Sequence, residues 1–224
     1  NSTGLGVENS IAIYGHYGYF ADNGALLQCI DLNTLTPVWA APITDDTDST
    51  VALDPPADGS VLLFTGCEVD MQKTGGKAYI RCFDALTGEL RWEYAEECAY
   101  DVDVNGGVLG SPIVCENSIG HLVYFHVAKV REGGGALLAF DKQTGEVVFR
   151  KSLPRYGWSS PVAIYDADGN AHIIVGDSGG TLRLLDALTG EQISTLSLQG
   201  NIEGSPAVFD DMLVIGTRGR VIYG

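Results

Sequence analysis

The sequence predicts an all-β protein assembled from repeated four-stranded antiparallel units. The prediction rests on short runs rich in β-branched and aromatic residues, on glycine between those runs, and on a turn motif that recurs along the chain. The 224 residues include 29 glycines, and 45% of them are hydrophobic, which is enough for a buried core. No run of about 18 apolar residues occurs, so the sequence contains no candidate transmembrane helix.

The recurring turn contains an aspartate followed, in most copies, by Thr-Gly. Each copy follows an apolar run, which we expect to be the third strand of a unit, and precedes a fourth strand. The aspartate accepts hydrogen bonds from backbone N–H groups of the turn, and the glycine takes a positive φ. The four copies are Asp31–Trp39, Asp84–Trp92, Asp141–Phe149 and Asp186–Ser194.

A second marker opens each unit with serine, followed in three of the five copies by proline. Proline is tolerated at the first residue of a strand because its missing N–H is not needed there. We expect a hairpin after the marker and a second strand that ends in glycine. The markers are Ser10-Ile11, Ser49-Thr50, Ser111-Pro112, Ser160-Pro161 and Ser205-Pro206.

Four strands in about 40–50 residues are typical of a β-propeller blade, as in WD40-like proteins. The apolar run followed by Asp-x-x-Thr-Gly and, in most copies, an aromatic residue resembles the PQQ-like (quinoprotein-type) repeat, over about residues 10–224. The resemblance implies a partial β-propeller of four-stranded antiparallel blades. We expect one domain, residues 1–224, with blades at about 10–48, 49–109, 110–158 and 159–203 and an incomplete fifth at 204–224.

The incomplete fifth blade lacks an outer strand in this prediction. We expect the chain to be the C-terminal part of a larger propeller, and the missing strand to come from residues nearer the N-terminus or from another chain. Open sheet edges and apolar blade faces favour association. The chain is therefore expected to associate with the missing N-terminal blades or with itself.

The charge of the chain excludes some classes of partner. The formal net charge is −16, from 13 Lys+Arg against 29 Asp+Glu. So acidic a surface repels phosphate, and we expect neither nucleic acid nor an anionic membrane as a partner. It favours Ca²⁺ or a basic ligand, although solubility alone also accounts for such a charge.

The family resemblance implies two specific activities as alternatives. In quinoprotein dehydrogenases the repeat tryptophan docks neighbouring blades, a position held here by Trp39, Trp92 and Phe149, and a pair of adjacent cysteines covers PQQ, the quinone cofactor. None of the five cysteines here is adjacent to another. We therefore assign no catalytic residue and do not expect PQQ. The other alternative is an assembly factor resembling the lipoprotein of the outer-membrane barrel-assembly complex.

Two acidic stretches are candidate Ca²⁺ sites. Asp101, Asp103 and Asn105 imitate the start of an EF-hand loop, but Pro112 stands where the bidentate glutamate belongs. Asp166 and Asp168, with Asp177 at the twelfth position, form the second candidate. The alternative readings are an acidic loop for the first stretch and a hairpin turn for the second.

Propeller ligands usually bind where loops from several blades converge. The loops that enter the first strands and those that leave the second strands are expected on one face. Acids mixed with aromatics there suit a basic peptide, a polyol or a sugar, and arginine suits a carboxylate. The predicted ligand face comprises Asp48, Glu68, Asp103, Tyr156, Trp158, Glu203 and Arg218. Packing at the inner rim is the alternative for Trp158.

The sequence therefore favours a non-catalytic scaffold that binds a protein or a small polar ligand. The resemblance places it outside the cytoplasm, as a secreted, periplasmic or cell-surface protein. The alternatives are a fragment of a PQQ-dependent oxidoreductase and the assembly factor named above.

Overall fold

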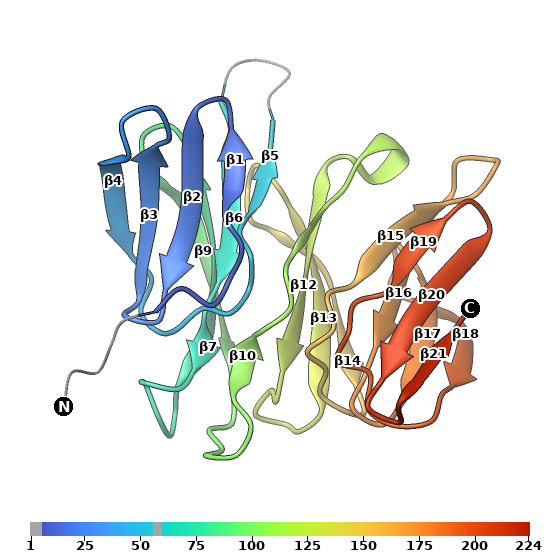
Figure 1. The fold of residues 1–224 in the computed structure, drawn as a ribbon. Helices are drawn as coiled ribbons and strands as arrows, with labels where there is room; N and C mark the ends of the chain where they lie inside the picture. The colour runs from blue at the N-terminus through green and yellow to red at the C-terminus, as the bar shows by residue number, and fades with distance from the viewer. Residues whose placement is uncertain (1–5, 56–59) are drawn as a thin grey trace. The chain divides into compact units, whose positions relative to one another are not determined.

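A computed structural model describes residues 6–55 and 60–224 of the chain. Within these ranges the protein is all-β, with antiparallel sheets and one short 3-10 turn. The predicted fold class, a partial β-propeller of four-stranded antiparallel blades, is confirmed (Figure 1). The chain divides into two compact units, Asn1–Leu109 and Gly110–Gly224. Among the described residues, no helix has the length and apolar character needed to cross a membrane.

Unit 1 contains two four-stranded sheets. Each is a meander, with its strands paired in chain order, β1-β2-β3-β4 and β5-β6-β8-β9. Strand β7, which follows the second strand of the second sheet, pairs antiparallel with β10, which follows the last strand of that sheet. The strands are β1 (Ala12–Tyr14), β2 (Tyr17–Asp22), β3 (Leu26–Asp31), β4 (Thr36–Pro42), β5 (Ala52–Asp54), β6 (Leu62–Gly66), β7 (Glu68–Val69), β8 (Lys77–Asp84), β9 (Leu90–Glu97) and β10 (Gly106–Val108).

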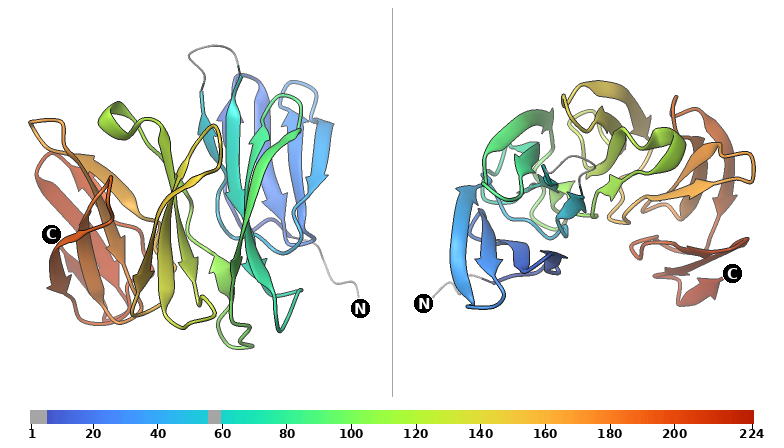
Figure 2. Two further views of the ribbon diagram at one scale, coloured as in Figure 1. Left: turned by 180° about the vertical axis from the view of Figure 1, so that it is seen from behind. Right: turned by 90° about the horizontal axis from the view of Figure 1, so that it is seen from above.

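Unit 2 contains three sheets, and the last has three strands, β19-β20-β21. This sheet lies beside the sheet of β15–β18 (Figures 1 and 2), and the two share a core around Ile202 and Ile215. The elements are β11 (Ile113–Val114), the 3-10 turn η1 (Asn117–Ile119), β12 (Leu122–Ala128), β13 (Gly135–Asp141), β14 (Val147–Leu153), β15 (Val162–Tyr165), β16 (Ala171–Gly176), β17 (Thr181–Asp186), β18 (Gln192–Ser197), β19 (Ala207–Phe209), β20 (Met212–Thr217) and β21 (Val221–Tyr223).

The repeated Asp-x-x-Thr-Gly turn has the geometry that the sequence predicts. In the second repeat, Oδ1 of Asp84 accepts the backbone N–H groups of Leu86 and Thr87, each at 3.0 Å. Gly88 closes the turn at a φ of 75°, which favours glycine. The turns at Asp141 and Asp186 repeat both features.

The bulky residue of the fourth strand packs onto the turn glycine of the next sheet. A Cβ added to Gly88 would lie 2.7 Å from the Trp39 ring, and one added to Gly190 would lie 2.7 Å from the Phe149 ring. Trp92 is 9% exposed and contacts Phe64 with ring centroids 5.9 Å apart. The motif therefore shapes a hairpin and also provides a flat surface for an aromatic ring.

The opening marker of the second repeat is Thr50, which corrects the predicted alignment on Ser49. The backbone N–H of Ser160 donates to Oγ of Ser205 at 3.0 Å, and the backbone N–H of Ser10 donates to Oγ1 of Thr50 at 3.1 Å. Strand β5 also begins two residues after Thr50, as β19 begins two residues after Ser205. Threonine was missed because the structural requirement is a hydroxyl acceptor, which either residue supplies.

Candidate functional site

Three carboxylates converge in unit 1, and we call them the acidic cluster: Asp46, Asp48 and Glu68. One oxygen of each lies within 4.8 Å of the others, the only group of at least three potential metal ligands in residues 6–55 and 60–224. Asp46 and Asp48 come from the loop before β5 and are partly buried, whereas Glu68, on β7, is 1% exposed.

Glu68 forms hydrogen bonds with two loops, the one before β5 and the one before β10. Its backbone N–H donates to the carbonyl of Asp46 at 2.9 Å. Its Oε1 accepts the backbone N–H of Asp48 at 3.2 Å, and its Oε2 accepts Nδ2 of Asn105 at 2.7 Å. Asn105 reaches it because β10 lies close to β7: a Cβ on Gly107, at φ 98°, would lie 2.7 Å from the Glu68 Cα. Only glycine permits that approach.

Asp45 fixes the loop that carries the other two carboxylates. Its buried side chain accepts backbone N–H groups from Met71 at 2.8 Å and Gln72 at 3.0 Å. It also accepts those of Asp70 at 3.2 Å and Asp46 at 2.8 Å. The two loops are thus joined by charge-assisted hydrogen bonds, and the acidic cluster is formed before any ligand arrives.

The electrostatics of the acidic cluster are unfavourable in the absence of a ligand. Burial, and after it the adjacent Asp48 charge, raise the pKa of Glu68 to about 8. Burial, together with a contact to Glu8, raises the pKa of Asp48 to about 6. Oδ1 of Asp48 is buried and accepts no hydrogen bond in the described structure. No ion pair in the described ranges involves the three carboxylates.

The first predicted Ca²⁺ stretch does not form a single site. Oδ1 of Asp101 accepts the backbone N–H of Asp103 at 3.0 Å, which makes a local turn, and Asp103 is exposed. Asn105 turns away from that turn to Glu68. The stretch that resembles an EF-hand start is therefore an acidic loop, and its last residue before β10, Asn105, reaches the acidic cluster.

The second predicted Ca²⁺ stretch is divided between the two ends of a strand. Asp166 and Asp168 lie in the β15–β16 turn, where Oδ1 of Asp166 accepts the backbone N–H of Asp168 at 2.9 Å. Asp177 follows the far end of β16, whose six residues span about 20 Å. Its buried carboxylate pairs with Arg183 at 2.5 Å. These three aspartates are too far apart to bind one ion.

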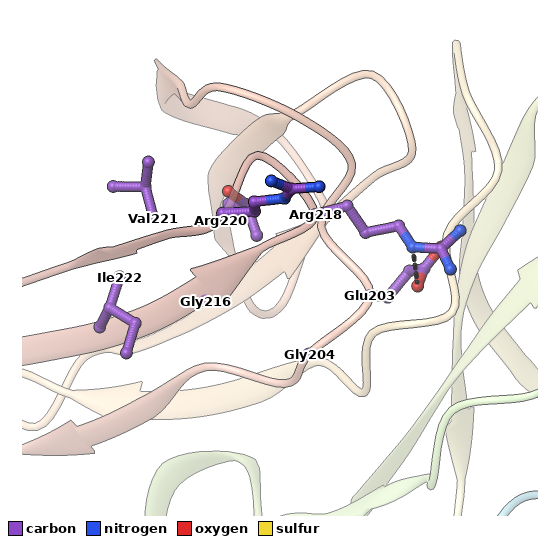
Figure 3. A pocket seen from close by; sticks show the side chains of 8 residues that line it. Glu203, Gly204, Gly216, Arg218, Arg220, Val221 and Ile222 are labelled. Atoms are coloured by element: carbon purple, nitrogen blue, oxygen red, sulfur yellow. Dashed lines mark ion pairs between the residues drawn. The ribbon is translucent and has the colours of Figure 1, made fainter.

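Within each unit, residues of the predicted ligand face lie in local groups. In unit 1, Asp48 meets Glu68 while Asp103 stays in its own turn. In unit 2, the rings of Tyr156 and Trp158 lie 6.0 Å apart. Glu203 and Arg218 form an ion pair at 3.2 Å beside a surface pocket of about 490 Å³ (Figure 3).

Asp46, Asp48 and Glu68 were not predicted to be metal ligands of one site. The available signal was the Asp45-Asp46-Thr-Asp48 run immediately before a blade and an acid immediately after that blade's second strand. Sequence spacing does not reveal this convergence, because 20 residues separate Asp48 from Glu68.

Comparisons with known proteins agree with the fold. The sequence model of a family described as outer membrane protein assembly factor BamB matches residues 133–224. No match was found among curated protein sequences. A europium-containing methanol dehydrogenase is similar with a TM-score of 0.66 and 13% identity, over 84% of this chain and 41% of that one. A quinohemoprotein alcohol dehydrogenase from Pseudomonas putida HK5 is similar with a TM-score of 0.61 and 16% identity, over 86% of this chain and 34% of that one.

The predicted resemblance to the PQQ-like repeat family is thus confirmed. The chain spans about a third to two fifths of the length of the two solved structures. At these identities the likeness concerns the fold, since one propeller architecture serves many unrelated activities.

Proposed function

We propose that this chain of PQQ-like β-propeller repeats is a non-catalytic binding scaffold that works outside the cytoplasm. Its ligand site is the acidic cluster of unit 1, and its ligand is positively charged. The observation that carries the proposal is the convergence of Asp46, Asp48 and Glu68 within 4.8 Å without a basic side chain paired to them in the described ranges. Like charges this close are stabilised by a cation or by protons.

The cluster is suited to binding because its shape is fixed in advance. Asp45 ties together the two loops that carry the carboxylates, through hydrogen bonds to Met71 and Gln72 at 2.8 and 3.0 Å. A site that is already ordered loses little conformational entropy when a ligand enters. A cation therefore gains the attraction of the cluster without first having to organise it.

The scaffold role and the location outside the cytoplasm draw support from the matched family, whose description is an outer-membrane assembly factor. A scaffold of this kind binds its partners through loops on a rigid propeller. A cationic ligand on so acidic a chain, with a net charge of −16, is also favoured by long-range attraction.

A fragment of a quinoprotein-type oxidoreductase is the second candidate. The fold of the alcohol and methanol dehydrogenases favours it, as does an oxygen-rich cluster that fits a hard cation such as Ca²⁺. The residues fit PQQ poorly, because the sequence has no pair of adjacent cysteines. Dye-coupled alcohol oxidation after addition of PQQ and Ca²⁺ distinguishes the candidates: turnover supports the enzyme and contradicts the scaffold.

Calorimetric titration of the whole chain tests the binding role. The probes are CaCl₂, spermidine and a decapeptide of alternating lysine and glycine. We expect at least one probe to bind saturably to the wild type and at least tenfold more weakly to Asp48→Asn. If no probe binds, or if all bind both proteins equally, the acidic cluster is not the ligand site.

A further inference from the structure

Two pairs of residues occupy equivalent positions in the second and the last repeat. Glu68 stands two residues after Gly66, at the end of β6, as Arg218 stands two residues after Gly216 in β20. The backbone N–H groups of Glu68 and Arg218 make the same hydrogen bond at 2.9 Å, to the carbonyls of Asp46 and Asn201. The other member of each pair, Asp48 or Glu203, stands two residues before the marker hydroxyl of Thr50 or Ser205.

The equivalent pairs differ in charge. In the last repeat, Nε of Arg218 lies 3.2 Å from Oε2 of Glu203, and Nδ2 of Asn201 donates to Oε1 of Glu203 at 2.7 Å (Figure 3). That carboxylate is therefore balanced by a guanidinium. In the second repeat a carboxylate replaces the guanidinium, because Glu68 occupies the position of Arg218.

We propose that a divalent metal ion of the Ca²⁺ type binds Asp46, Asp48 and Glu68 and supplies the positive charge that Arg218 supplies in the last repeat. This inference rests on the proposed function and names its ligand. The ion joins the loop before β5 to the loop after β6, as the Arg218–Glu203 pair joins the corresponding loops of the last repeat.

The geometry of the oxygens suits a metal ion. Ca²⁺ binds oxygen at about 2.4 Å, so two oxygens on one ion lie at most about 4.8 Å apart. The ligand oxygens of the cluster lie within 4.8 Å of one another. The Oδ1 atom of Asp48 is buried and accepts no hydrogen bond, although the side chain as a whole is only partly buried, and it is available to bind the ion. Carboxylate oxygens are the preferred donors of hard cations.

The charge of the cluster favours a divalent ion over an amine. The three carboxylates carry up to three negative charges, of which a lysine ammonium offsets one and Ca²⁺ offsets two. The Asn105 amide donates a hydrogen bond to Glu68, so that Oε2 of this carboxylate stays partnered beside the ion.

The closing experiment uses the whole chain, stripped with a chelator and titrated with CaCl₂ at pH 8. We expect saturable heat with a stoichiometry of one, a higher thermal midpoint, and sensitised luminescence when Tb³⁺ replaces Ca²⁺. Asp48→Asn should weaken binding at least tenfold. Asp168→Asn is the matched control, because it removes an exposed aspartate from the β15–β16 turn, and it should bind as the wild type does.

Glu68→Gln separates a metal ligand from a structural carboxylate. Glutamine keeps a carbonyl oxygen to accept hydrogen bonds but removes the repulsive charge. We expect this variant to lose the calcium response and to be at least as stable as the chelator-treated wild type at pH 8. A variant that is less stable but still binds Ca²⁺ with wild-type affinity would overturn the assignment.

The outcomes also separate this inference from the proposed function. If Ca²⁺ and Tb³⁺ do not bind, but the lysine peptide binds and Asp48→Asn abolishes that binding, the metal inference is wrong and the binding role stands. If neither metal nor peptide binds the wild type, both are wrong.

Discussion

The indole N–H of Trp39 donates to the carbonyl of Ala85 at 2.9 Å, while the same ring covers Gly88 three residues further on. One side chain of the first sheet thus contacts both the start and the end of the turn in the second sheet. This contact joins a local motif, the Asp-x-x-Thr-Gly turn, to the packing of neighbouring blades.

Gly88→Ala tests that contact. The alanine Cβ would sit 2.7 Å from the Trp39 ring at a φ of 75°. We expect a loss of about 1 kcal/mol for the positive φ and about 1–3 kcal/mol more for overpacking. Urea unfolding of the whole chain measures it. Gly75→Ala is the control, because Gly75 has a φ of 86° and open space around its missing Cβ. Equal losses in the two variants would show that the ring contact contributes nothing.

The contact between Trp39 and Gly88 shows which features of the fold can be predicted from the sequence. The Asp-x-x-Thr-Gly turn is local, so its hydrogen bonds and positive φ follow from a few neighbouring residues. Repetition along the chain then predicts the four-stranded unit. The partnership of Trp39 with Gly88 required the family resemblance, because no local pattern states which sheet packs against which.

The acidic cluster shows which features of the site cannot be predicted from the sequence. Asp48 and Glu68 were placed on one face by counting strands, and the structure brings them together. Asp46 joins them through the loop that Asp45 fixes. The diversion of Asn105 from an apparent EF-hand start depends on the β7–β10 pair, which has no periodic signal because β7 has only two residues. Asp166 and Asp177 failed as one site for the opposite reason: a regular strand separates them.

Asp45→Asn should loosen the loops that carry the acidic cluster. The amide retains one oxygen where the carboxylate now accepts four backbone N–H groups at 2.8–3.2 Å. We expect a loss of about 2–3 kcal/mol in the free energy of unfolding, the range for buried hydrogen bonds to a charged group. Chemical denaturation provides the measurement. The exposed Asp168→Asn should change it by less than about 0.5 kcal/mol. Equal stability of the two variants would contradict the role of Asp45.

Gly107→Ala should weaken the cluster without altering any acidic residue. Its Cβ would press on the backbone of Glu68 at 2.7 Å, so β10 must withdraw and carry Asn105 away from Oε2 of Glu68. We expect Ca²⁺ affinity to fall about tenfold, which corresponds to about 1.4 kcal/mol. Asn105→Ala should reproduce most of this loss, because it removes the same hydrogen bond. Calorimetry that finds Asn105→Ala unchanged would show that the amide does not orient Glu68.

The stability of the metal-free protein should fall as pH rises from about 5 to about 8. The groups facing Glu68 are Asp46, Asp48 and Asn105, with Glu8 beyond Asp48. The pKa of Glu68 is raised to about 8 from an ordinary 4.5, and that of Asp48 to about 6 from 3.8. Between these pH values the folded chain holds protons that the unfolded chain has already released. The free energy of unfolding therefore falls as pH rises and the folded chain loses those protons.

Chelator-treated protein unfolded by urea at pH 5, 6.5 and 8 should show that decline. Glu68→Gln should flatten it, because the group with the largest shift no longer ionises. Saturating Ca²⁺ should also flatten it in the wild type, since the ion takes the place of the protons and its binding releases them. A decline of the same slope in Glu68→Gln would assign the pH dependence to groups outside the acidic cluster and would remove the electrostatic support for a cation there.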